Sequence, residues 1–179
     1  SDSHTVKIGV ISTLTGPAAY YGQSTMKGAE IGKIVAEKRY PNLKMQLFHE
    51  DSLFTPKGGI NVYNKLRSVD NIDAVITQGS NIGVAVQPLA LKDGILQVSA
   101  SVLANNYSTP SDLSFRLTAK ADLEIAPVVE YLKMKKYRSP LKNPLNDLLG
   151  VTERSAVMEL KKNDKGPQIL SRTHDMEHK

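Results

Sequence analysis

Short apolar runs rich in β-branched residues alternate with stretches of helical periodicity over the first 135 residues of the chain. The runs predict strands at 6–12, 44–50, 73–77, 95–99 and 114–118. Apolar residues spaced by three and four predict helices over 23–39, 55–68, 82–92 and 121–135. Strands joined by helices of this length require right-handed crossovers and therefore a parallel sheet. The sequence predicts an α/β fold, a doubly wound parallel sheet with strand order 2-1-3-4-5.

The alternation stops after Tyr137, where a sixth strand is due. The next segment contains Pro140 and Pro144, and proline cannot donate to a sheet ladder, so we expect no central strand there. Helical spacing returns over 151–163 and one further apolar run follows at 168–173. We therefore expect a ligand-binding α/β lobe at 1–135 and a partial second lobe or tail at 136–179.

Composition excludes several classes of protein. The chain has 179 residues, 40% of them hydrophobic, which is enough for a globular core. It has no cysteine, which excludes a disulfide scaffold and thiolate metal sites. The net charge is +5, but the excess lies after residue 133 with few aromatics, which favours a solvated helix and tail over a nucleic-acid groove. The first residues do not resemble a signal sequence, so we expect either a cytosolic protein or one whose signal peptide has been removed.

Three polar loops follow the strands whose carboxyl ends should meet at one edge of the sheet, at 12–22, 78–83 and 99–105. Ligands of open parallel sheets bind at this edge. The loops are rich in hydroxyls and small residues, which suit an anion or carboxylate held by hydroxyls and backbone N–H groups. They contain no carboxylate pair, histidine or lysine for acid, base or nucleophilic chemistry. The sequence thus predicts binding without catalysis. The alternative, to which we give equal weight, is that these small polar residues serve only to form tight turns.

Three aromatic residues are expected near this edge. Tyr20 and Tyr21 lie in a Gly/Pro-containing segment rather than on an apolar face, which makes them candidates for ligand contact. Phe54 is assigned to packing, because aromatic side chains usually fill the core. The first loop lacks the glycine-rich patterns of nucleotide-binding loops, so no nucleotide cofactor is expected.

A zinc-peptidase pattern, H-x-x-E-H, occurs at His174, Glu177 and His178. Two histidines one helical turn apart could hold zinc, with the glutamate as base. The pattern ends one residue before the last residue of the sequence, where a frayed turn cannot preorganise ligands, so we keep it only as a remote alternative and expect no metal. His4 and His49 are expected to be a tail residue and a strand-face residue.

A phosphorylated switch protein is a further alternative, because it shares this architecture. It would need acidic residues clustered after the first and third strands. Glu50 and Asp51 follow the second strand, and Thr77 and Gln78 follow the third. The acidic pocket is therefore incomplete.

Taken together, several segments resemble the type I periplasmic solute-binding proteins of branched-chain amino acid ABC transporters. One of them is LTGPAAYYG at 14–22. The others lie at 6–12, 27–30, 50–52, 55–56, 73–76, 95–101 and 114–118. The resemblance covers 6–133 well, weakens at 138–150 and resumes at 151–173. It implies two α/β lobes that close on a small molecule, a periplasmic location after removal of a signal peptide, delivery to a membrane permease and no catalysis.

The resemblance also implies a set of ligand-facing residues in the three loops. They are Tyr20, Tyr21, Ser80, Asn81, Ser101 and Leu103. Amino-acid binders of the family often have Thr at the position of Leu103 and Tyr at that of Leu149. Because leucine cannot hold a polar ligand group, the resemblance implies a carboxylate with an apolar or aromatic body rather than a free α-amino acid.

Members of this family are about twice as long as this chain, since each lobe is an ordinary domain. We therefore expect most of lobe one and only the opening of lobe two, with apolar faces over 138–179 that favour a homodimer or exchange of segments between chains. A ligand-sensing receptor domain with the same fold is the alternative function.

Overall fold

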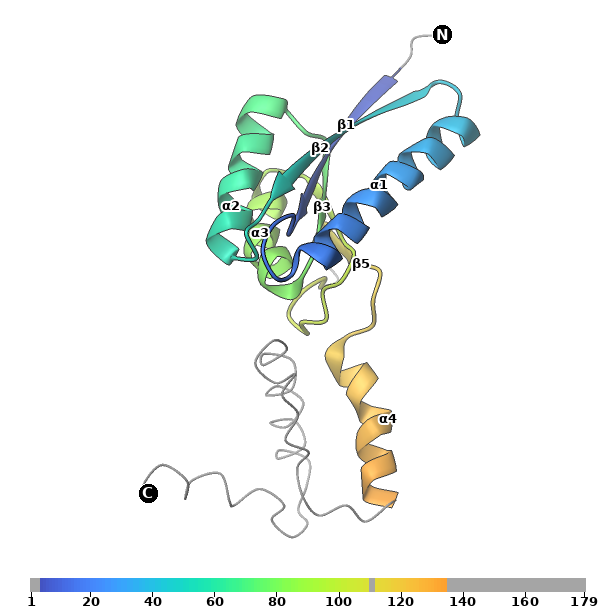
Figure 1. Cartoon of the computed structure of the whole chain (residues 1–179), viewed down its shortest axis with the longest axis vertical. Coiled ribbons are helices and arrows are strands. Elements are labelled where there is room, and N and C mark those ends of the chain that lie inside the picture. The colour runs from blue at the N-terminus through green and yellow to red at the C-terminus, as the bar shows by residue number, and fades with distance from the viewer. Residues whose placement is uncertain (1–3, 110–111, 135–179) are drawn as a thin grey trace. The chain divides into compact units, whose positions relative to one another are not determined.

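The structure is a computed structural model, and it describes residues 4–109 and 112–134 (Figure 1). The chain divides into two compact units, Ser1–Ala119 and Lys120–Lys179. The predictions for 136–179, including the partial second lobe, the strand at 168–173 and the H-x-x-E-H pattern, lie outside the described residues. The predicted domain boundary near residue 135 stays a prediction.

The first unit contains a five-stranded parallel sheet in the order β2-β1-β3-β4-β5, which confirms the predicted fold class. Its strands are β1 (His4–Ser12), β2 (Leu43–Asp51), β3 (Ala74–Thr77), β4 (Leu96–Ser99) and β5 (Ser114–Arg116). Its helices are α1 (Ala19–Arg39), α2 (Pro56–Lys65) and α3 (Ser80–Lys92), with one π-helical turn at Leu66–Asp70. Every strand therefore ends at the same edge of the sheet.

The helices α2 and α3 pack on each other and on one face of this sheet (Figure 1). Thr55 caps α2 by accepting a hydrogen bond from Gly58 N, and Pro56 occupies its first turn. The core lies beneath these helices. Its fully enclosed members are Ile11, Tyr63, Leu66, Ile72, Val75, Ile82, Val86, Ala90 and Ile95. Of the apolar residues in this segment, Tyr63 and Leu66 are buried, whereas Ile60 and Val62 are only partly buried.

The helix α1 lies over the other face, against β1 and β2 (Figure 1). It begins at Ala19 rather than at Gln23, so the predicted loop over 13–22 is too long by one helical turn. Gly22 permits the early start, because a Cβ there would lie 1.8 Å from the Thr13 carbonyl oxygen. Ile31 and Ile34, whose spacing predicted the helix, are exposed on its outer side.

The helix α3 also begins earlier than the predicted helix at 82–92, at Ser80, and it contains Pro88. The first described helix of the second unit is α4 (Ala121–Met134), which corresponds to the predicted helix at 121–135. Among the residues that the structure describes, no helix is both long and apolar enough to cross a membrane.

Candidate functional site

Two loops of the predicted binding edge are joined by reciprocal hydrogen bonds. Ser101 Oγ accepts from Gly79 N at 3.1 Å, and Ser80 Oγ accepts from Leu103 N at 3.1 Å. Each serine therefore holds the backbone of the loop opposite it. The structure thus brings Ser80, Asn81, Ser101 and Leu103 together where β3 and β4 end.

The two serine hydroxyls keep a free donor. A hydroxyl has one hydrogen and two acceptor lone pairs, and each of these oxygens uses an acceptor position for the backbone N–H. Among the described residues, neither hydroxyl hydrogen has a partner. Ser80 Oγ and Ser101 Oγ are thus fixed in position by the protein and can both donate to an anionic ligand.

The first turn of α3 adds backbone donors at the same place. Gly79 stands before it without a side-chain cap, and no acidic residue occupies the first turn. Ile82 N is bonded to Asn81 Oδ1 and Gly83 N to Gly79 O, which leaves Ser80 N and Asn81 N unpaired within the described part of the chain. The positive end of the helix dipole favours an anion at these groups.

The loop after β1 is tied to its neighbours on both sides. Thr13 N donates to Gln78 Oε1 at 3.3 Å, and the Thr13 and Ser52 hydroxyls lie 3.3 Å apart. Asp51, at the end of β2, accepts from Leu14 N at 3.0 Å and from the Thr15 hydroxyl. The loop that leads into α1 is therefore held by side chains from β2 and β3.

Burial raises the pKa of the Asp51 carboxyl, but hydrogen bonds from Thr15, Leu14 and Leu53 outweigh it and hold that pKa below its usual range. Asp51 is therefore charged at neutral pH and acts as an acceptor for the loops. Glu50, next to it, pairs with Lys65 Nζ at 2.6 Å. These partners occupy both carboxylates.

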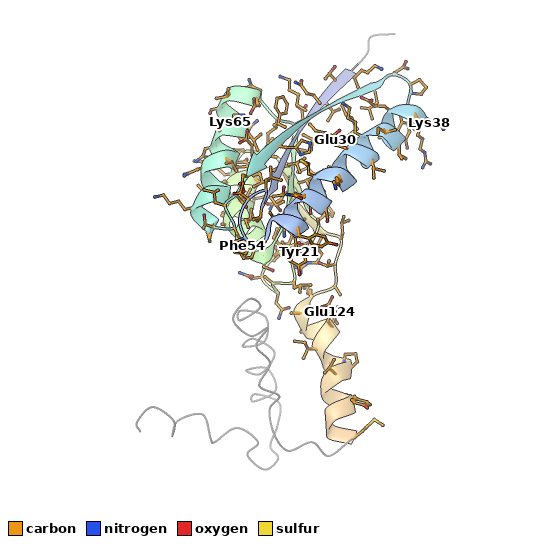
Figure 2. All side chains as sticks on the ribbon, viewed as in Figure 1. Tyr21, Glu30, Lys38, Phe54, Lys65 and Glu124 are labelled. Atoms are coloured by element: carbon orange, nitrogen blue, oxygen red, sulfur yellow. The ribbon has the colours of Figure 1, made fainter. Side chains whose placement is uncertain are left out.

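Tyr20 and Tyr21 lie in the first turn of α1 rather than in a loop, which corrects the sequence prediction. Both are exposed, and their rings form an edge-to-face pair with centroids 5.8 Å apart. Figure 2 shows Tyr21 and Phe54 at the same end of the first unit, the end at which the strands terminate. No hydrogen bond among the described residues joins the tyrosines to the serine pair.

Two residues at this edge were missed from the sequence. Gln78 is buried, and its Oε1 accepts from Thr13 N, so its side chain ties the loop after β1 to the end of β3. Arg116 donates to the carbonyl oxygens of Val102 at 3.0 Å, Ala104 at 2.9 Å and Tyr107. The only sequence signal for these bonds to the third loop was a charged arginine within the short predicted strand at 114–118.

The alternative chemistries gain no support from the described residues. There, no three His, Asp or Glu side chains gather closely enough to hold a metal ion. His49 lies on β2, as expected, and its Nε2 is 2.7 Å from Glu30 Oε1. His174, Glu177 and His178 lie outside the described residues.

Three solved structures show the same fold over most of this chain. LivJ, a branched-chain amino acid transporter substrate-binding protein from Streptococcus pneumoniae in complex with isoleucine, gives a TM-score of 0.70 at 18% identity, over 86% of this chain and 47% of LivJ. The leucine-binding protein LivK from Thermotoga maritima gives 0.67 at 18% identity, over 87% of this chain and 46% of LivK. A solute-binding protein of an ABC transporter from Rhodopseudomonas palustris BisB5, in complex with 3,4-dihydroxybenzoic acid, gives 0.63 at 16% identity, over 86% of this chain and 44% of that protein.

The chain thus spans less than half the length of each of these proteins. At identities this low, the structural matches show the fold alone, which is that of type I periplasmic binding proteins. No curated protein matches the sequence at a significant level. The sequence profile described as "Periplasmic binding protein" matches residues 5–140, which is most of the chain. The chain belongs to the periplasmic binding protein family.

Proposed function

We propose that this chain binds a small carboxylate-bearing molecule at the edge formed by the β1, β3 and β4 loops, as the solute-binding component of an ABC transporter, and releases it unchanged. The observation that carries the proposal is the serine pair. Ser80 and Ser101 each accept one backbone N–H from the opposite loop, which leaves both hydroxyl hydrogens without a partner among the described residues, next to the first turn of α3. A carboxylate offers the acceptors that this set requires.

The part of the ligand other than its carboxylate, here called its body, is proposed to be aromatic or aliphatic and to carry no α-amino group. Leu103 lies beside the serine pair and has no polar atom to receive an ammonium or hydroxyl group. A buried polar group without a partner costs about 1–3 kcal/mol, so the site favours ligands whose polar atoms are confined to the carboxylate. The solved relatives contain isoleucine in one case and 3,4-dihydroxybenzoic acid in another, and we propose that this chain is closer in preference to the second.

The ligand-facing residues of the proposal are those predicted from the sequence. They are Tyr20, Tyr21, Ser80, Asn81, Ser101 and Leu103. The partner is a membrane permease, the location is the periplasm after removal of a signal peptide, and no cofactor or catalytic step is involved. Self-association through 138–179 is part of the same proposal, and its test is a light-scattering mass: a single-chain mass with that segment resistant to protease contradicts it.

Thermal shift and titration calorimetry on the full chain test the proposal. The ligand panel contains benzoate, hexanoate, leucine and valine, with benzamide as the uncharged control. We expect stabilisation by the two acids, none by benzamide, and a loss of affinity of about 10- to 150-fold in Ser80→Ala and in Ser101→Ala, because each removes a charge-assisted hydrogen bond worth about 1.5–3 kcal/mol. Ser68→Ala is the matched control, since its hydroxyl bonds only Asn64 O at the far end of α2.

Stabilisation by leucine or valine without stabilisation by the acids overturns the proposed ligand body. Turnover of any panel compound overturns the non-catalytic role. The melting temperatures of the unliganded serine variants show whether loss of the cross-loop bond, rather than loss of a ligand contact, accounts for weaker binding.

A further inference from the structure

The turn at residues 52–55 has an unusual backbone for its sequence. Leu53 and Phe54 both have positive φ, at 52° and 56°, and Thr55 N donates to Ser52 O at 3.1 Å to close the turn. This is the φ pattern of a type I′ turn, which normally takes Asn-Gly or Gly-Gly. Large side chains in the left-handed region are strained, and such strain persists only where the surroundings impose it.

The surroundings impose it here through three hydrogen bonds from separate side chains. Asp51 Oδ1 accepts from Leu53 N at 2.9 Å, and the Oγ atom of the buried Ser52 accepts from Phe54 N at 3.3 Å. From the opposite loop, Asn81 Nδ2 donates to Phe54 O at 2.8 Å. A residue from the first turn of α3 thus helps to hold the strained turn in place.

The turn places the Phe54 ring beside the proposed carboxylate site. Phe54 Cε2 lies 3.9 Å from the position that a Cβ on Gly79 would occupy. Gly79 directly precedes Ser80 and donates its N–H to Ser101. The ring nevertheless stays 39% exposed, so it is not the core residue that the sequence predicts.

We propose that Phe54 is a specificity-determining residue of this site, an apolar wall against which the body of the ligand packs while its carboxylate is bound by Ser80 and Ser101. The inference rests on the proposed function and names the ligand class further, as an acid with a flat or extended apolar body. An aromatic ring that is partly exposed beside anchored donors gains contact area when such a body covers it. An acid without a body gains nothing from Phe54.

NMR titrations of the full chain with benzoate and with acetate separate these two contributions. In Phe54→Ala we expect at least tenfold weaker binding of benzoate and less than a twofold change for acetate. Phe54→Tyr keeps the ring and should bind benzoate as the unmodified chain does. This variant shows whether weaker binding in Phe54→Ala comes from loss of the ring or from substitution within the turn. Leu53→Ala is the matched control, because its side chain belongs to the same turn and is more exposed, and we expect no change with either acid.

Unchanged benzoate binding in Phe54→Ala overturns this inference and leaves the proposed carboxylate site standing. An equal loss of benzoate and acetate binding in Phe54→Ala also overturns it, because it assigns the residue to the anchor rather than to the wall. Failure of both acids to bind the unmodified chain overturns the proposed function, and the inference with it.

Discussion

The two faces of the sheet differ in how far the same strands are buried. On the face under α2 and α3, Val75 and Thr77 of β3 and Gln97 of β4 are almost completely enclosed. Their neighbours on the opposite face include Leu96, which is 41% exposed, and Phe115 of β5, which is 54% exposed. Successive residues of a strand point to opposite faces, so the contrast reflects which helices cover each face rather than the composition of the strands.

Coverage differs because α1 lies over β1 and β2, while the β3–β5 side of its face has no helix among the described residues of the first unit. Even under α1 the packing is loose, because a groove of about 400 Å³ lies between that helix and the sheet, lined among others by Gly28 and Gly32 of α1, Met45 of β2 and Ile76 of β3. The enclosed face should therefore supply most of the stability of this unit, and the open face little. The predictions that follow test this difference, from the largest expected effect to the smallest.

Leu66→Ala should lower the free energy of unfolding by about 2–5 kcal/mol, because it leaves a cavity in the enclosed face. Leu66 is fully buried against Gly9 and the core of α2 and α3. Ile34→Ala, on the outer side of α1, is the matched control and should change stability by no more than about 0.5 kcal/mol. Urea titrations followed by circular dichroism measure both, and equal losses in the two variants would contradict the comparison.

Two glycine-to-alanine substitutions should change stability in opposite directions. A Cβ on Gly83 would lie 2.4 Å from Val102 Cγ2, which is fully buried, so Gly83→Ala should destabilise by about 1–3 kcal/mol. A Cβ on Gly28 would meet nothing within 4 Å, so Gly28→Ala should stabilise α1 by up to about 1 kcal/mol. Thermal melts of the two variants give the signs, and a loss of stability in Gly28→Ala would mean that the α1 groove is filled.

Tyr107 provides a pH test of the enclosed face. Burial raises its pKa to about 12, from 10 in the unfolded chain. Its contribution to stability is therefore complete below pH 10 and is lost as the pH rises toward 12. Tyr107→Phe should cost about 1 kcal/mol at pH 7, through loss of the hydrogen bond to Phe115 O, and should remove this part of the alkaline loss. Unfolding titrations at pH 7 and pH 11 measure both effects, and an identical decline in the variant would assign the alkaline loss to other groups.

The strand order and most element positions could be predicted, because they depend on local periodicity and on the handedness of crossovers. The start of α1 could not, since it depends on the close approach of Gly22 to Thr13, two residues that only the fold brings together. Helical spacing of Ile31 and Ile34 predicted a helix correctly and gave no information on what covers its apolar side.

For the candidate site, too, the sequence identified the local elements but not the contacts between them. Polar loops at the carboxyl ends of parallel strands identified Ser80 and Ser101 as candidates, and the fold places them together. The bonds that fix their hydroxyls join residues 22 and 23 apart in sequence, and the bond from Asn81 to the strained turn at Phe54 spans 27 residues. Such partners depend on the register between loops, which local sequence patterns do not encode.

The smallest change in stability is expected for substitutions on the outer side of α1. Ile31, Ile34 and Val35 are each more than half exposed, so replacing all three by glutamine removes apolar surface from water contact without opening a cavity. We expect a change in unfolding free energy within about 0.5 kcal/mol per site, together with reduced binding of 1-anilinonaphthalene-8-sulfonate, which marks exposed apolar patches. The same substitutions made at Ile82 and Val86 of the enclosed face should instead prevent folding. Strong destabilisation by the α1 triple variant would show that this side of the helix is covered in solution, and the contrast between the two faces would then be lost.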